Sequence, residues 1–165
     1  MEDDLSETED LVATLAALLR GRGVALATAE SCTGGLIAAA CTTLAGSSEW
    51  FERGFVTYSN AAKTEMLGVA AESIVRHGAV SAEVALAMAE GALAHSDAEW
   101  SVAVTGIAGP GGATPGKPVG TVWLAVARKG SPARAELLQL DGDRASVRSQ
   151  TVDRALQRLI VALRA

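Results

Sequence analysis

Ser31 and Lys63 are the two residues whose types and places in the chain could together perform nucleophilic catalysis. Ser31 follows a short apolar run, VALATA (24–29), that predicts a buried strand, and it precedes CTGGLIAAACTTL (32–44), which predicts a helix. Lys63 lies in YSNAAK, directly after a second predicted strand, GFVTYS (54–59). If the two strands are parallel, both side chains lie at the same carboxyl end of the sheet, where a serine hydroxyl could meet its base.

Each of these residues also has a simpler structural interpretation. A serine before a helix is commonly an N-cap, and a lysine on a short helix is commonly solvated. The neighbouring amides of Cys32, Thr33 and Gly34 could instead bind an oxyanion or a phosphate. A lysine with a free pKa of about 10.4 must fall to about 7 to 8 to act as a base, which requires burial or a cationic neighbour.

Other catalytic arrangements have less support in the sequence. The G-x-S-x-G pattern of an α/β-hydrolase is absent, and His77 and His95 are both predicted to be surface residues near helix ends. Gly111 to Lys117 matches G-x-x-x-x-G-K, but Pro118 replaces the hydroxyl residue of a P-loop and a strand follows in place of a helix. We therefore predict that 106–120 is a loop whose amides form a wall of a substrate pocket.

Arg144 and Arg148 lie one turn apart at the predicted start of the last helix, where the helix dipole disfavours cations. Because Arg154 and Arg158 continue roughly the same side, a solvated arginine face is one interpretation. The other is a fork that binds phosphate, since guanidinium groups match phosphate geometry.

The predicted elements that must position these residues alternate between strand and helix. We expect a three-layer α/β/α sandwich with a mixed, mostly parallel sheet. Residues 1–8 are predicted to be a flexible acidic tail and residues 9–165 a single domain. The expected helices are a first one through residues 11–19 closed by Gly21, then 32–44, a short one from about Asn60, a short segment near 71–76, 82–95 and 144–164, and the expected strands lie at 24–29, 54–59, 101–105, 121–127 and 135–140.

The composition limits the partners that the chain could have. Its 165 residues are 49% hydrophobic and 20% charged, as in a globular protein, and the formal net charge of −5 argues against a nucleic-acid partner. No apolar run approaches the roughly 18 residues that span a bilayer, and the acidic start MEDDLSETED is unlike a secretory signal. With Cys32 and Cys41 predicted to be free thiols, we expect a cytoplasmic protein. Helix 82–95 is apolar around most of its circumference, which predicts a homodimer or larger homo-oligomer.

Several spaced segments resemble one known family. TAESCTGGLIAAACT, GFVTYSNAAKTEMLGV, HGAVSAEVALAMAEGAL and VAVTGIAGPGGATPGKPVGTVWLAV are similar to the C-terminal domain of the CinA family, the PncC-like nicotinamide-mononucleotide amidohydrolase domain. The similarity covers nearly the whole chain from about residue 8. It implies a metal-independent hydrolase that converts nicotinamide mononucleotide to nicotinate mononucleotide and ammonia in pyridine-nucleotide salvage, without a cofactor.

The resemblance also implies roles for individual residues. Ser31 would be the nucleophile, Lys63 the general base, Tyr58 and Thr105 would line the site, and Glu30 would orient the dyad. With the resemblance and the turn and loop amides taken together, the predicted substrate-binding residues are Glu30, Cys32, Thr33, Gly34, Gly35, Tyr58, Thr105, Gly106, Gly109, Gly111, Arg144 and Arg148.

Two other functions stay open on the sequence alone. One is a non-catalytic nucleotide-binding or regulatory module linked to competence or DNA repair, and the other is an amidase for a different nucleotide-like carboxamide. No metal site is expected, because the sequence has no Cys/His or His/carboxylate cluster at ligand spacing.

Overall fold

The computed structural model describes the backbone of residues 2–165 and the side chains from residue 7 onward. In chain order the elements are α1 (Glu2–Arg22), β1 (Leu26–Glu30), α2 (Leu36–Cys41), the 3₁₀ helix η1 (Ser47–Glu49), β2 (Phe51–Val56), α3 (Asn60–Leu67), α4 (Ala71–His77), α5 (Ala82–Ala94), β3 (Trp100–Gly106), β4 (Thr121–Arg128), β5 (Arg134–Gln139) and α6 (Arg144–Arg164).

The five strands form one sheet in the order β2-β1-β3-β4-β5. β1 is parallel to both of its neighbours, β2 and β3, whereas β4 is antiparallel to β3 and to β5. Only β4 therefore runs against the other strands, and the predicted mixed, mostly parallel sheet is confirmed. All five residues of β1 are buried, as expected for a strand covered by helices on both faces.

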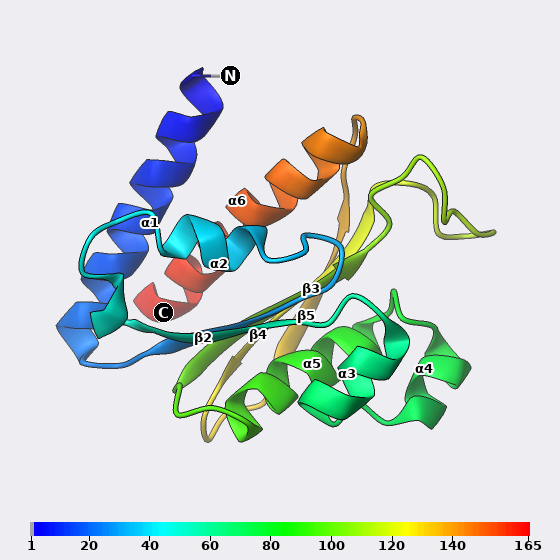
Figure 1. The fold of residues 1–165 in the computed structure, drawn as a ribbon, viewed down its shortest axis with the longest axis horizontal. Coiled ribbons are helices and arrows are strands. Elements are labelled where there is room, and N and C mark those ends of the chain that lie inside the picture. Colours follow the sequence, from blue (N-terminus) through cyan, green and yellow to red (C-terminus); the bar gives the residue numbers. More distant parts are fainter. Residues whose placement is uncertain (1) are drawn as a thin grey trace.

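Helices cover both faces of the sheet, so the predicted three-layer sandwich is confirmed (Figure 1). α1, α2 and α6 lie on one face, over a core that includes Leu15, Trp50 and Leu159. α3, α4 and α5 lie on the other, over a core of smaller residues such as Ala27, Ala103 and Met88. The alternation of β1 side chains between the two cores explains the near-continuous apolar run that predicted this strand.

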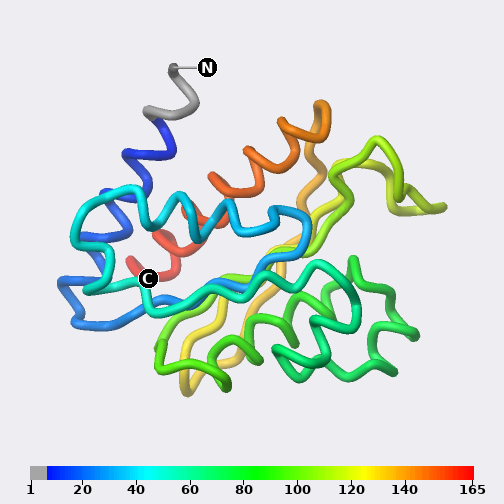
Figure 2. The backbone as a smooth tube through the Cα atoms, in the orientation of Figure 1, coloured from blue at the N-terminus to red at the C-terminus, as the bar shows by residue number. Residues whose placement is uncertain are grey.

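The carboxyl ends of β1, β2 and β3 lie at one end of the molecule, and the 107–120 loop extends beyond the sheet at that same end (Figure 2). β1 continues there into residues 31–35, which we call the 31–35 turn, and β2 continues into the segment that begins α3. This is the edge at which open α/β sheets usually bind their ligands.

Three local predictions differ from the structure. The strand expected at 54–59 is β2 at Phe51–Val56, so Tyr58 and Ser59 lie beyond its end. The expected tail at 1–8 lies mostly within a helix, because the backbone of α1 already begins at Glu2; Met1 lies outside the described residues. The Thr8 hydroxyl donates to Asp153 of α6 at 2.6 Å, which ties this part of α1 to α6. The helix expected at 32–44 begins only at Leu36, so Cys32 lies in the 31–35 turn.

α5 packs closely within its own chain. One side lies on the sheet and another contacts α3 and α4, so its apolar circumference is covered without a partner subunit. The homo-oligomer stays a prediction, but the surface that suggested it is largely occupied. The closest approach is at Gly91, where a Cβ would lie 2.1 Å from the backbone oxygen of Leu67 in α3.

We expect Gly91→Ala to lower the free energy of unfolding by about 1 to 3 kcal/mol, because the added methyl group must push α3 and α5 apart. Denaturant unfolding measures the change. Gly21→Ala is the matched control: Gly21 lies in α1 with open space where a Cβ would extend, so alanine there should maintain or raise stability. Equal stability of the Gly91 variant and the wild type would contradict this packing argument.

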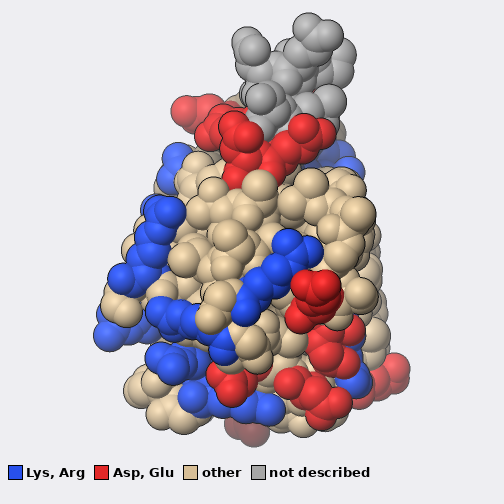
Figure 3. All heavy atoms as spheres, turned by 90° about the vertical axis from the view of Figure 1, so that its left-hand side faces the viewer, with Lys and Arg blue, Asp and Glu red and all other residues tan. Residues whose placement is uncertain are grey.

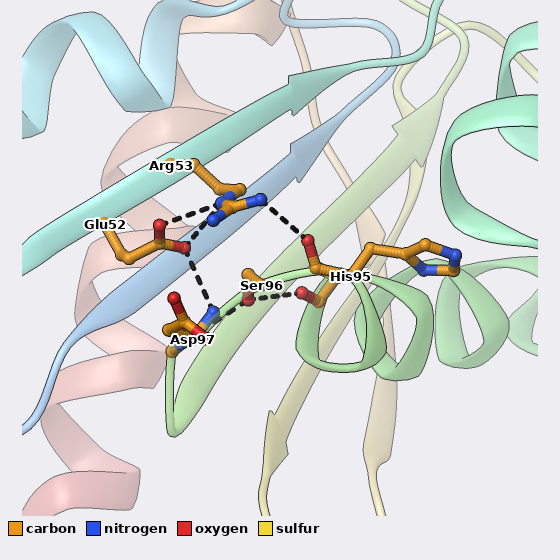
Figure 4. Close-up of polar contacts among 7 residues, drawn as sticks. Glu52, Arg53, His95, Ser96 and Asp97 are labelled. Atoms are coloured by element: carbon orange, nitrogen blue, oxygen red, sulfur yellow. Dashed lines mark hydrogen bonds and ion pairs between the residues drawn. The ribbon is translucent and has the colours of Figure 1, made fainter.

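The edge strand β2 is tied to the turn between α5 and β3 by polar contacts (Figure 4). Arg53 donates to the carboxylate of Glu52 and, at 3.0 Å, to the carbonyl of His95, while Glu52 accepts from the amide of Asp97 at 3.3 Å. The hydrogen bond from Arg53 holds the pKa of Glu52 below its ordinary value. Charged side chains on an edge strand also disfavour pairing with a strand of another chain.

The face in Figure 3, at the end remote from the 107–120 loop, carries basic and acidic side chains together, so it does not form the uniformly basic surface that duplex binding requires. Within residues 2–165, no helix has both the length and the apolar character needed to cross a membrane.

Candidate active site

A cavity of about 270 Å³ lies at the carboxyl ends of β1, β2 and β3. Five chain segments form its walls: the start of the 31–35 turn, the segment from the end of β2 into α3, residues 79–80 before α5, the 105–112 segment, and the start of α6. The lining residues are Ser31, Cys32, Tyr58, Asn60, Lys63, Ala79, Val80, Thr105, Gly106, Ile107, Ala108, Gly109, Gly111, Gly112 and Arg144.

The 31–35 turn holds Ser31 at the cavity. The amide of Ser31 donates to Val104 of β3 at 3.1 Å, and its carbonyl accepts from the amide of Gly34 at 3.1 Å, which closes a tight turn. Gly34 and Gly35 both have positive φ angles, 59° and 108°, a backbone conformation that side chains with a Cβ adopt at a cost. The two glycines of the CTGG motif thus let the chain leave β1 sharply and expose the serine hydroxyl to the cavity.

Lys63 contacts Ser31 directly. Its Nζ lies 3.0 Å from Ser31 Oγ and donates to the carbonyls of Thr57 at 2.9 Å and Tyr58 at 3.2 Å. α3 positions this lysine, because the Ser59 hydroxyl caps the helix by accepting from the amide of Ala62 at 3.0 Å. Lys63 is only 1% exposed, so the interpretation as a solvated lysine is wrong.

The surroundings of Lys63 favour its neutral form. Burial lowers the pKa of the Lys63 amine below its ordinary value, and the nearby Cys32 thiol partly opposes this effect. Nζ is placed to donate to Ser31 Oγ and to three carbonyls, the third being that of Ser59 at 3.5 Å; a neutral amine would instead have a lone pair with which to accept from the Ser31 hydroxyl. This arrangement can remove a proton from the serine.

Cys32 lines the cavity beside Ser31 but is a poor competing nucleophile. Burial, together with the nearby Glu30, raises the pKa of the Cys32 thiol to about 11, so the reactive thiolate is scarce at neutral pH. Cys41 is likewise buried and free.

Glu30, which was expected to orient the dyad, contacts the 31–35 turn and the start of α2. Its carboxylate accepts from the Thr33 hydroxyl at 2.6 Å and from the amides of Ile37 and Ala38 at 2.7 and 3.1 Å. It therefore caps the start of α2 and braces the 31–35 turn from behind, and it does not line the cavity. Because this carboxylate already occupies the first amides of α2, they are closed to a phosphate.

The long loop is held to the rest of the site by hydrogen bonds. Thr105 Oγ1 donates to Ala79 at 2.8 Å, which brings the segment before α5 to the cavity. Lys117, the lysine of the P-loop-like pattern, donates to the carbonyl of His77 at 3.2 Å. The loop is followed by the strand β4, whereas a P-loop is followed by a helix. The pattern is thus part of a loop that walls the cavity.

The two arginines at the start of α6 contact different walls of the site. Arg144 donates to the carbonyl of Gly109 at 2.8 Å and to the Tyr58 hydroxyl at 3.1 Å, across the cavity mouth. Arg148 donates to the carbonyls of Cys32 and Thr33, both at 3.2 Å. It lines an adjoining groove and is not among the residues that line the cavity.

The cavity brings together most of the residues predicted from the sequence and leaves out others. Ser31, Cys32, Tyr58, Lys63, Thr105, Gly106, Gly109, Gly111 and Arg144 line it, whereas Glu30, Thr33, Gly34, Gly35 and Arg148 do not. Asn60 was not predicted, although it lies inside the YSNAAK motif that could have indicated it. Ala79, Val80, Ile107, Ala108 and Gly112 were not predicted either, and Ala79 and Val80 carry no local chemical signal.

The residues from 7 onward include no group of three or more His, Cys, Asp or Glu side chains placed to hold a metal ion. His77 is paired with Glu83 at 3.7 Å, and His95 Nδ1 lies 2.9 Å from the carbonyl of Gly91. Neither histidine lines the cavity, which leaves Lys63 as the base within reach of Ser31 among these residues.

Comparison with known proteins gives relatives of two lengths. Nicotinamide-nucleotide amidohydrolase PncC of Escherichia coli K12 is 49% identical over 93% of both chains, and the protein of the same name from Pseudomonas putida is 56% identical over 86% of this chain and 88% of its own. A CinA-like protein of Citrifermentans bemidjiense is 56% identical over 93% of this chain. This chain spans only 36% of that longer relative.

Solved structures agree with the sequence relatives. The competence/damage inducible protein CihA from Agrobacterium tumefaciens has a TM-score of 0.92 and 47% sequence identity, with 96% of each chain covered. The family model of the CinA C-terminal domain matches residues 8–163, nearly the whole chain. The chain therefore belongs to the CinA C-terminal domain family.

Proposed function

We propose that this protein is an amidohydrolase that deamidates nicotinamide mononucleotide to nicotinate mononucleotide and ammonia. The observation that carries the proposal is the 3.0 Å contact between buried Lys63 Nζ and Ser31 Oγ inside a cavity lined by loop amides. The names and high identities of the PncC relatives, which match this chain over most of their length, support the substrate.

The reaction proceeds through an acyl-enzyme. Neutral Lys63 accepts the Ser31 hydroxyl proton as Oγ attacks the carboxamide carbon, and the C–O bond forms while the carbonyl oxygen becomes an oxyanion. When this intermediate collapses, the C–N bond breaks and the Lys63 ammonium returns its proton to the leaving nitrogen, which departs as ammonia. Lys63 then takes a proton from a water molecule whose oxygen attacks the ester carbon. As the C–O bond to Ser31 breaks, the Lys63 ammonium returns this proton to Oγ, and nicotinate mononucleotide is released.

The oxyanion needs hydrogen-bond donors at the cavity wall. The amide of Cys32 directly follows the nucleophile, and the loop residues Ala108, Gly109 and Gly111 also line the cavity. These backbone groups are our candidates for the oxyanion hole. The step requires no metal in this proposal, because Lys63 supplies the base and the amides supply the electrostatic stabilisation.

The deciding experiment is ammonia release from nicotinamide mononucleotide by the purified protein, with and without a chelator such as EDTA. We expect equal release in both. Loss of activity with the chelator, restored by a divalent cation, would contradict a metal-independent mechanism. Binding of the nucleotide without ammonia release would favour the regulatory module, and faster release from another nucleotide-like carboxamide would change the substrate.

We assign the phosphate of the substrate to Arg144, because it lines the cavity and is exposed at the mouth. Arg144→Ala should raise KM for nicotinamide mononucleotide by about 10- to 100-fold, through the loss of roughly 1.5 to 3 kcal/mol of charged hydrogen bonding. Nicotinamide riboside, which lacks the phosphate, should respond little. An equal effect on both compounds would mean that Arg144 only braces Tyr58 and Gly109.

A further inference from the structure

We infer that Arg148 is a positioning residue for the nucleophile, acting through the 31–35 turn, and that it does not bind the substrate phosphate. This inference rests on the proposed function. The same arginine could be assigned to phosphate from the sequence, where it lies one helical turn after Arg144. The contacts of its guanidinium group lead to a different role.

Two hydrogen bonds join the Arg148 side chain to the backbone of the turn. Nε donates to the Cys32 carbonyl and Nη2 to the Thr33 carbonyl, each at 3.2 Å. The Thr33 carbonyl has a second hydrogen-bond donor, the amide of Leu36. The Cys32 carbonyl has Arg148 as its donor among the described residues. A partly buried carbonyl without a donor is costly, so this arginine is bound to the turn before any ligand arrives.

These contacts fix the direction of the peptide groups that follow Ser31. The Cys32 carbonyl shares a planar peptide group with the Thr33 amide, so holding the carbonyl sets the orientation of that whole group. The preceding peptide group carries the Cys32 amide and is set by the bond from Gly34 N to Ser31 O. Arg148 thus holds the middle of the turn, while Ser31 N, bonded to Val104, holds its start.

The rest of the site explains why this support is needed. Gly34 and Gly35 lack the Cβ that restricts the backbone of other residues, and Gly34 is exposed. Glu30 braces the turn from the α2 side, whereas Arg148 reaches it from α6. Without the arginine, the glycines can move, and Ser31 Oγ with its neighbouring amide loses its alignment with Lys63.

The test is the kinetics of Arg148→Ala. We expect kcat to fall by about 10- to 100-fold with KM changed less than about threefold, because misplacing the reacting group affects the chemical step more than binding. The decrease should be the same for nicotinamide mononucleotide and nicotinamide riboside. Arg148→Lys keeps one donor group, which can serve one carbonyl at a time, and should have an intermediate kcat.

Arg158→Ala is the matched control. It removes the same charge from the same helix, about 15 Å further along at 1.5 Å per residue, where Arg158 pairs with Glu136 of β5. It should keep wild-type kcat and KM. Hydrogen exchange of the free protein provides a readout that needs no substrate: the amides of residues 31–36 should exchange faster in Arg148→Ala than in the wild type and in Arg158→Ala.

Three results would overturn the inference: an unchanged kcat, a rise in KM confined to the phosphorylated substrate, or unchanged exchange in the 31–36 segment. A folded Arg148→Ala protein with uniformly faster exchange would also overturn it, since it would show a general loss of stability. If the wild type released no ammonia, the proposed function would fail, but the exchange experiment would still decide whether Arg148 holds the turn.

Discussion

Ser31→Ala should lower kcat for ammonia release by roughly 10³- to 10⁶-fold and leave substrate affinity nearly unchanged. The reason is that the substitution removes the atom that forms the acyl-enzyme and leaves the cavity walls in place. The turn does not depend on the Ser31 hydroxyl, because it is held by its backbone, Glu30 and Arg148. Steady-state kinetics and calorimetric binding of the nucleotide measure the two quantities.

Ser48→Ala, an exposed serine in η1, is the matched control and should retain full activity. Incubation with substrate followed by rapid acid quenching should allow the acyl group to be detected by mass on Ser31 in the wild type and not in the variant. Turnover at the wild-type rate by Ser31→Ala would rule out the covalent mechanism.

Lys63→Met should lower kcat by about 10²- to 10⁴-fold, the usual contribution of a general base. Lys63→Arg should not restore activity, because a guanidinium group holds its proton at working pH. In the wild type the base is active only when neutral, so kcat/KM should rise with pH until it passes the lowered pKa of Lys63 and then level off. A profile of kcat/KM against pH between about 5 and 10 measures this rise.

The variants also separate a base from a cation that only stabilises charge. The residual activity of Lys63→Met should lack the pH limb assigned to Lys63, while Lys117→Met, which removes a lysine outside the cavity, should keep it. Full activity of Lys63→Arg would show that the position needs only a positive charge.

That Ser31 and Lys63 could meet was predictable from topology on the condition that their strands are parallel, while their roles as nucleophile and base came from the family resemblance. Parallel strands end at the same edge, so residues just after β1 and β2 are neighbours; the apolar runs located these ends approximately, with β2 ending at Val56 and not at residue 59. The 106–120 loop was predictable from its glycine and proline content, and it follows the third parallel strand. The fold class was predictable because the alternation of strands and helices dictates three layers.

The roles of Glu30 and Arg148 were not predictable, because each depends on hydrogen-bond partners that only the folded chain supplies. Glu30 was expected to orient the dyad or bind the substrate, and the partners that hold its carboxylate, the first amides of α2, could not be read from the sequence. Arg144 and Arg148 look equivalent in the sequence, but one turn of α6 is enough to direct them to different walls. Ala79 reaches the cavity through its bond from Thr105, a contact between segments far apart in the chain.

The hydrogen bonds between α6 and the 31–35 turn affect the order in which the folding protein gains activity. The bonds from Arg148 join residues 115 and 116 positions apart, and the bond from Arg144 to Tyr58 spans 86. Such long-range closures are slow compared with helix and hairpin formation. A nascent chain therefore contains its serine and lysine long before it contains either arginine, and during refolding the return of hydrolysis should lag behind the return of helical signal until α6 docks.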